Sequence, residues 1–166
     1  MAVPVPEFVR SIQETPVGQA IRESGWMFPT IESIHVLAIV LVAGSIAMVD
    51  LRLLGVSSRN HSVTKISTEV LPWVWTAFVF AAITGSLLFV SNATKYFINI
   101  PFRFKLLFMA CAGVNMLIFN IVTSRSVHNW DTAVATPAAA RVAGALSLLF
   151  WILVVAFGRW IGFTLS

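Results

Sequence analysis

Glu32 and His35 stand three residues apart inside a long apolar stretch. Residues at that spacing share one face of a helix, so the carboxylate and the imidazole would lie side by side. Ionisable groups within a membrane segment are costly and typically mark functional sites. An imidazole nitrogen can also ligate haem iron, alone or together with a methionine sulfur. The pair therefore leaves three alternatives open: proton chemistry, cofactor binding, or hydrogen bonding between helices.

Four apolar runs must position this pair. Hydrophobic residues make up 58% of the chain and charged residues 11%, whereas soluble domains are about 25% charged. Each run approaches the roughly 20 residues that a helix needs to cross a bilayer. The runs cover residues 27–49, 71–91, 104–122 and 142–163. This pattern predicts an all-α integral membrane four-helix bundle in one domain, residues 27–166, after an N-terminal interfacial helical segment, residues 1–26.

The N-terminal segment predicts two short helices. Pro6 and Pro16 suit first helical positions, and Thr15 suits the cap of the second helix. An apolar stripe along both helices would lie either on the membrane surface or against the protein's own bundle. The stripe consists of Phe8, Ile12, Ile21 and their apolar neighbours.

The charge pattern suits a bilayer rather than a nucleic acid. The net charge is +4, and the basic residues stand singly in loops and near the ends of the runs, where they meet lipid headgroups. Basic residues are nearly balanced between the two membrane sides. The cluster Lys95, Arg103 and Lys105 favours termini in the cytoplasm.

The depth of His35 can be estimated from the helical rise of about 1.5 Å per residue. His35 lies about 12 Å into the first run, and the same depth on the other runs reaches Thr84 and Gly85, residues 109–113, and residues 155–158. Small residues at this level would let helices pack closely around a hydrogen-bonding histidine. Alternatively, they would leave room for haem, with His35 as one axial ligand and Met109 as its partner.

Glu32 lies one turn nearer the surface than His35. It would interact with the positive end of its own helix, or form an ion pair with Arg103 or Lys105, which enter the membrane from the same side. The alternative is a proton relay between water and His35.

The remaining polar and reactive residues favour structural roles. Asn115 and Asn120 would join helices, and the single cysteine, Cys111, would be a packing residue. A set of His61, His128 and Asp131 resembles a metal site in composition, but the long separations favour a solvated loop face. No Gly-rich phosphate loop, HExxH or GxSxG motif occurs, which argues against a hydrolase or a nucleotide-driven pump.

Several segments resemble a family of small bacterial membrane proteins of uncharacterised function, over residues 26 to about 125. The segments are residues 26–37, 50–55, 71–73, 84–85 and 102–105. More distantly, the chain is similar to HemJ-type protoporphyrinogen oxidases and CopD-type copper-resistance proteins. The shared features are a His in the first span, an Arg just after it, a Pro and a Gly in the second, and a Lys opening the third.

The HemJ-type resemblance implies that His35 ligates haem b and, less directly, that Lys105 belongs to the site. The third run carries Asn115 and Asn120 instead of a further histidine, so the resemblance supplies no second ligand. We therefore expect a small haem-b redox or electron-transfer protein of the bacterial inner membrane. His35 would be its metal ligand, with Met109 and Glu32 also at the cofactor, and quinone or a partner subunit would exchange electrons with it.

Two other functions remain open. A non-enzymatic structural or accessory subunit would use the same polar residues only to join helices or protomers, as a homo-oligomer or within a complex. Metal or small-solute transport follows from the CopD-type resemblance alone. Whether the chain is an enzyme stays open.

Overall fold

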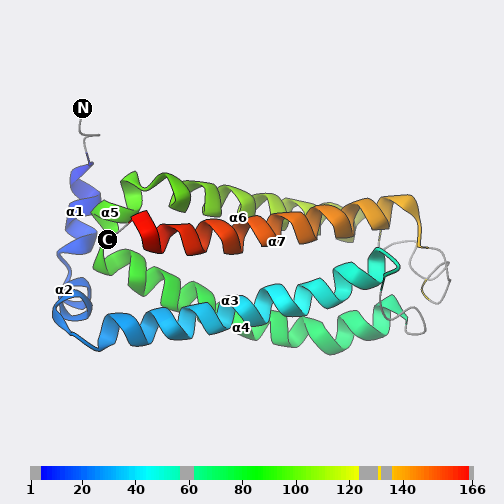
Figure 1. Ribbon diagram of the computed structural model, residues 1–166, viewed down its shortest axis with the longest axis horizontal. Helices are drawn as coiled ribbons and strands as arrows, with labels where there is room; N and C mark the ends of the chain where they lie inside the picture. The colour runs from blue at the N-terminus through cyan, green and yellow to red at the C-terminus, as the bar shows by residue number, and fades with distance from the viewer. Residues whose placement is uncertain (1–4, 57–61, 124–130, 132–135, 165–166) are drawn as a thin grey trace.

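The computed structural model describes residues 5–56, 62–123, 131 and 136–164, and within them it is all-α (Figure 1). Its helices are α1 (Glu7–Gln13), α2 (Pro16–Glu23), α3 (Met27–Leu53), α4 (Val63–Ser91), α5 (Ala93–Ile98), α6 (Ile100–Ile118), a π-helical turn (Phe119–Thr123) and α7 (Ala138–Thr164). Four of them, α3, α4, α6 and α7, are long and apolar enough to cross a membrane. The prediction of an all-α membrane protein with four spanning helices and short N-terminal helices is confirmed.

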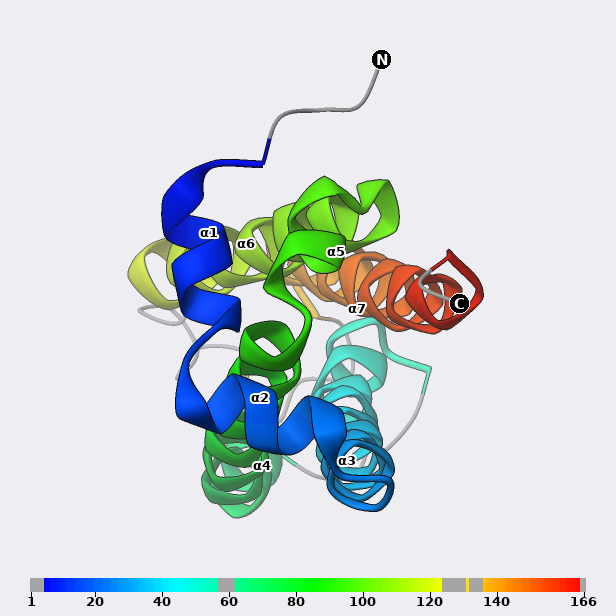
Figure 2. The ribbon, with the colours of Figure 1, turned by 90° about the vertical axis from the view of Figure 1, so that its left-hand side faces the viewer.

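The spanning helices form two pairs. α3 packs along α4, α6 packs along α7, and the pairs meet mainly where α3 contacts α7 (Figures 1 and 2). A small apolar core joins them, made of Val42, Ala77, Ala112, Trp151 and Val154. Large apolar side chains are exposed on the outer surface of all four helices. Such a surface belongs in lipid, because soluble proteins rarely expose large contiguous apolar areas.

α3 and α7 approach each other closely at Gly144. A Cβ atom at this position would lie 3.0 Å from Leu53 Cβ and 3.1 Å from the carbonyl oxygen of Asp50. Small residues commonly allow this contact between membrane helices, where van der Waals packing drives association.

Gly144→Ala is expected to lower the apparent melting temperature in detergent. Overpacking costs about 1–3 kcal/mol, and a chain of this size loses about 2–4 °C per kcal/mol. Gly113→Ala is the matched control, because a Cβ there meets nothing within 4 Å. Alanine favours helix over glycine at both positions, so equal melting of the two variants would contradict the role of the close contact.

Several helix boundaries differ from the apolar runs, among them the end of α3 and the start of α4. α3 continues to Leu53 and ends in a Schellman motif at Gly55, whose φ is +74°. α4 begins at Val63, where Ser62 accepts a hydrogen bond from the Lys65 amide at 3.1 Å. The run that begins at residue 71 predicts Pro72 in the first turn of this helix, and this prediction is wrong, since Pro72 lies inside α4. The polar first turns of α4 escape a hydropathy pattern because they need no apolar side chains.

The connection between the second and third runs also contains structure that the apolar pattern misses. α5 occupies part of it, and α6 then begins at Ile100. The Asn99 side chain caps α6 by accepting a hydrogen bond from the Phe102 amide at 2.9 Å. This earlier start moves Lys105 deeper into the third spanning helix than the run beginning at residue 104 implies.

The N-terminal helices dock on the end of the bundle (Figure 2). Thr15 caps α2 as predicted, accepting a hydrogen bond from the Gly18 amide at 3.3 Å, whereas Pro6 precedes α1 as its N-cap instead of opening it. Val9 and Ile21 are each 1% exposed. Of the two predicted placements, the structure therefore shows packing against the protein's own helices.

Candidate functional site

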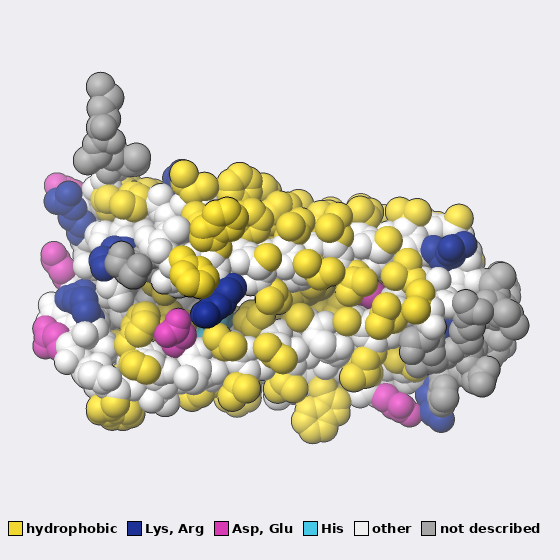
Figure 3. All heavy atoms as spheres, viewed as in Figure 1, with side chains coloured by type: hydrophobic (Ala, Val, Ile, Leu, Met, Phe, Trp, Pro, Cys, Tyr) yellow, Lys and Arg dark blue, Asp and Glu magenta, His cyan; other side chains and the backbone are white. Residues whose placement is uncertain are grey.

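A cavity of about 1530 Å³ lies between the two helix pairs, toward the end that carries the N-terminal helices. All four spanning helices line it, together with residues of α1, α2 and α5. Figure 3 shows a hollow on one face of the molecule where basic, acidic and histidine side chains meet among hydrophobic ones. Glu32, His35, Lys105 and Met109 all line this cavity.

His35 hydrogen-bonds to α4 through one ring nitrogen. Its Nδ1 lies 3.0 Å from the carbonyl oxygen of Ala81 and 3.0 Å from Thr84 Oγ1. A carbonyl oxygen can only accept, so Nδ1 carries a proton. The Thr84 hydroxyl donates to the carbonyl oxygen of Phe80 at 2.6 Å, which leaves the Thr84 oxygen to accept from His35. These contacts fix the orientation of the imidazole ring and place a proton on Nδ1.

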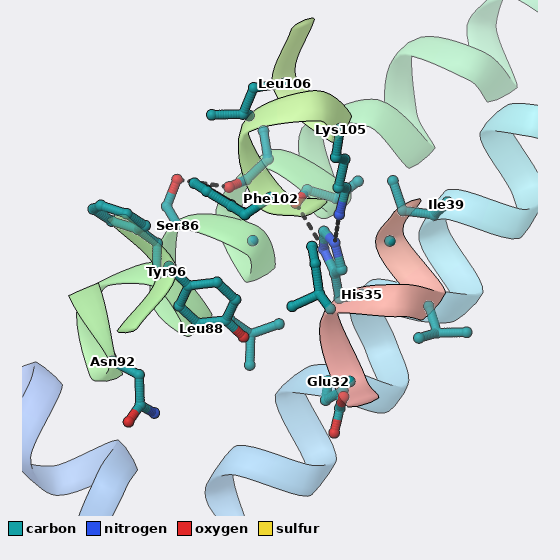
Figure 4. A pocket seen from close by; sticks show the side chains of 18 of the residues that line it. Glu32, His35, Ile39, Ser86, Leu88, Asn92, Tyr96, Phe102, Lys105 and Leu106 are labelled. Atoms are coloured by element: carbon teal, nitrogen blue, oxygen red, sulfur yellow. Dashed lines mark hydrogen bonds between the residues drawn. The ribbon is translucent and has the colours of Figure 1, made fainter. Parts of the chain in front are cut away.

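The other ring nitrogen faces Lys105. His35 Nε2 lies 3.3 Å from Lys105 Nζ. Figure 4 marks this contact with a dashed line. An ammonium group can only donate, so Nε2 accepts with its lone pair and the ring carries its one proton on Nδ1. His35 thereby connects α3 to α4 and to α6. This arrangement can accept a proton, ligate a metal if Lys105 moves, or hold three helices together.

Two glycines shape the space around these side chains. A Cβ at Gly85 would lie 2.9 Å from His35 Cε1, so the ring packs directly on the backbone of α4. A Cβ at Gly158 would lie 3.8 Å from the end of the Lys105 side chain. The depth estimate that places Thr84 and Gly85 beside His35 agrees with this geometry. Gly113 lies elsewhere: it is exposed, and a Cβ there would meet nothing within 4 Å.

The predicted ion pair of Glu32 with Arg103 or Lys105 is absent from the described residues, although all three side chains line the cavity. Glu32 is exposed. Arg103 lies over the Phe97 ring, 5.7 Å from its centroid, and Lys105 contacts His35 instead. The difference follows from the start of α6 at Ile100, which brings Lys105 to a depth where its long side chain reaches the imidazole.

Met109 lies one helical turn beyond Lys105 and packs against the apolar core while lining the cavity. Its place on α6 keeps it in the same cavity as His35. Cys111 is half-buried and does not line the cavity among the described residues.

Tyr96 is a cavity residue that the sequence pattern misses. It lies on α5, outside the spanning helices, is 8% exposed, and belongs to an aromatic cluster with Phe89 and Phe102. Burial and, second, the nearby Glu32 carboxylate raise the pKa of Tyr96 to about 12. The phenol therefore stays protonated at neutral pH and can donate a hydrogen bond into the cavity. An aromatic residue near a membrane interface gives no sequence signal that separates this position from an ordinary belt residue.

The opposite end of the bundle carries buried charged residues in structural roles. Arg52 is 1% exposed and donates to the carbonyl oxygen of Asp131 at 3.3 Å and to Thr136 Oγ1 at 3.4 Å. The Asp131 carboxylate in turn accepts from the Thr64 amide at 2.8 Å. These bonds fasten Asp131 and Thr136 to α3 and α4.

The predicted metal-like set is only partly visible, because His61 and His128 lie outside the described residues. Within the described ranges, no group of three or more His, Cys, Asp and Glu side chains is placed to hold a metal ion. Asn115 donates to the carbonyl oxygen of Ala143 at 2.9 Å, which joins α6 to α7 as predicted.

The comparisons with known proteins bear on the family of this chain. No curated protein and no solved structure matches it. A family model described as a family of unknown function, DUF6644, matches residues 13–164. The matched segment contains all four spanning helices and the whole His35 cavity apart from Ile12. This small integral membrane protein therefore belongs to the family of unknown function DUF6644.

Proposed function

We propose that the chain is a small membrane redox protein that holds haem b in the cavity between the helix pairs, with His35 as an axial ligand. The observation that supports it most directly is the hydrogen bond from His35 Nδ1 to the carbonyl oxygen of Ala81. Metal-ligating histidines typically donate their other ring N–H to a carbonyl or carboxylate, which directs the remaining lone pair at the metal. Here that lone pair is on Nε2, beside Lys105 at the cavity wall.

The dimensions and lining of the cavity fit a flat apolar macrocycle. Its volume of about 1530 Å³ exceeds the roughly 300–1,000 Å³ of ordinary ligand pockets. Gly85 removes bulk beside the imidazole. Met109 would offer a thioether as the second ligand, and exposed Glu32 would exchange protons on the propionate side. Lys105 would have to swing away from Nε2 for iron to bind there.

Bound haem b would supply a one-electron carrier. The chain's own residues would orient it through His35 and exclude water with the apolar wall. Quinone or a partner subunit in the bilayer would be the exchange partner. The distant resemblance to HemJ-type proteins supports the same assignment of His35.

The visible spectrum of protein purified in mild detergent, after expression with adequate haem supply, tests this proposal. We expect a Soret band that His35→Ala abolishes. Lys105→Met is the informative companion variant, because removing the ammonium leaves Nε2 accessible and should preserve or strengthen the band. A folded, colourless wild-type protein would refute haem binding.

A structural or accessory role is the second candidate, and a specific observation favours it. Both ring nitrogens of His35 already contact protein atoms on α4 and α6, as in a residue that joins helices. This function predicts that His35→Ala and Lys105→Met both lower the melting temperature of a colourless protein. The haem function predicts opposite effects of the two variants on the Soret band.

A further inference from the structure

We propose that the cavity mouth binds an anionic phospholipid from the surrounding bilayer, with the lipid phosphate among basic side chains and an acyl chain along the apolar wall. The proposal does not rest on haem binding. The cavity is large enough for more than one occupant by the standard of ordinary pockets, and the mouth lies on the interface side of the His35 level.

The first argument is the charge of the lining. Basic side chains enter the cavity from four different helices, whereas Glu32 is the acidic residue among its described lining residues. The basic residues are Arg22 on α2, Lys95 on α5, Arg103 and Lys105 on α6, and Arg159 on α7. A cavity with this excess of positive charge attracts an anion.

The second argument is how the three arginines are held. Arg22 donates to backbone carbonyl oxygens of Ser91 and Gln13, and Arg103 and Arg159 lie over aromatic rings at 5.7 and 5.2 Å. Among the described residues, no carboxylate forms an ion pair with any of the three. Carbonyls and rings orient a guanidinium without neutralising it, so the positive charge remains available to a phosphate.

The third argument is the apolar side of the cavity. Val36 and Val40 of α3 and Val155 of α7 line it and are 53%, 57% and 41% exposed. These residues lie on spanning helices, so the cavity opens sideways toward hydrocarbon, on the face seen in Figure 3. A soluble anion gains nothing from such a wall, whereas an acyl chain makes van der Waals contacts along it.

The depth of the basic groups agrees with a lipid headgroup. Arg22 precedes the first spanning helix, and Arg103 lies within the first turn of α6. Both therefore lie near the level of lipid phosphates. Lys105 lies deeper in the membrane, and its positive charge also attracts the lipid phosphate. Basic side chains at this level are the groups that attract anionic lipid headgroups to membrane proteins.

Native mass spectrometry after reconstitution in phosphatidylcholine nanodiscs containing phosphatidylglycerol tests the proposal. We expect retained phosphatidylglycerol on the full chain, reduced roughly 30-fold in the Arg103→Gln/Arg159→Gln double variant, in line with two lost basic residues. Arg10→Gln/Arg141→Gln is the matched control. Both of its positions are exposed and lie outside the described cavity lining, so retention should stay within about twofold of wild type.

Three outcomes would overturn the proposal: equal retention of phosphatidylcholine and phosphatidylglycerol, equal losses in both double variants, or displacement of the lipid by millimolar inorganic phosphate. The last would identify a soluble anion as the ligand. Circular dichroism and gel-filtration profiles confirm that each variant is folded. The Soret band is recorded on the same samples, so a colourless protein that retains phosphatidylglycerol refutes haem binding alone.

Discussion

Gly85→Ala is expected to displace His35 and destabilise the bundle. The new Cβ would lie 2.9 Å from His35 Cε1, a separation that requires the imidazole to move away from α4. The 3.0 Å contacts of Nδ1 with Ala81 and Thr84 would then lengthen together. Overpacking of this kind costs about 1–3 kcal/mol, or roughly 2–12 °C in apparent melting temperature at about 2–4 °C per kcal/mol.

A thiol-reactive dye can follow the melting, because the chain has a single cysteine and Cys111 is half-buried on α6. Gly113→Ala is again the control, on the same helix as the reporter and with no neighbour near its Cβ. If Gly85→Ala also restores full stability when combined with His35→Ala, the clash with the imidazole is the cause. A Gly85→Ala protein as stable as Gly113→Ala would contradict the close packing.

The Gly85 contact also illustrates what the sequence could predict about this site. Alternating helix direction and a constant rise per residue are enough to place Thr84 and Gly85 at the level of His35. In the structure both residues contact the His35 ring. The spanning helices are equally predictable, since hydrocarbon thickness sets their length and composition. Both predictions depend only on distance along the helix axis, which follows from residue number.

The contact between Lys105 and His35 could not be predicted in this way. It depends on Asn99 capping α6 and on the lateral pairing of α6 with α7 rather than with α4. A capping residue such as Asn99 is polar, so a hydropathy pattern does not show where the helix begins. Which helices lie side by side depends on side-chain packing, and one sequence does not reveal that. Tyr96 is not predictable from the sequence either, because α5 is too short to produce a periodic signal.

Gly18→Ala is expected to detach α2 from the end of the bundle. A Cβ at Gly18 would lie 2.7 Å from the carbonyl oxygen of Gln13 and 2.9 Å from that of Val90. Both atoms belong to the backbone, so neither can yield as a flexible side chain would. Moving α2 would expose Ile21, now 1% exposed, and break the 3.2 Å bond from Arg22 to the carbonyl oxygen of Ser91.

Limited trypsin digestion in detergent measures this detachment, since cleavage after Arg22 requires local opening of α2. We expect the docked state of α2 to lose about 2 kcal/mol of stability, within the range for burying one isoleucine side chain. When opening is rapid, this loss corresponds to roughly 30-fold faster cleavage. Gly25→Ala is the matched control, because nothing lies within 4 Å of its Cβ. Equal cleavage rates in the two variants would show that the docking of α2 does not depend on the Gly18 contact.

Because Arg22 lines the cavity mouth, faster cleavage in Gly18→Ala should coincide with weaker retention of phosphatidylglycerol. This result would link the docking of the N-terminal helices to lipid binding in the cavity.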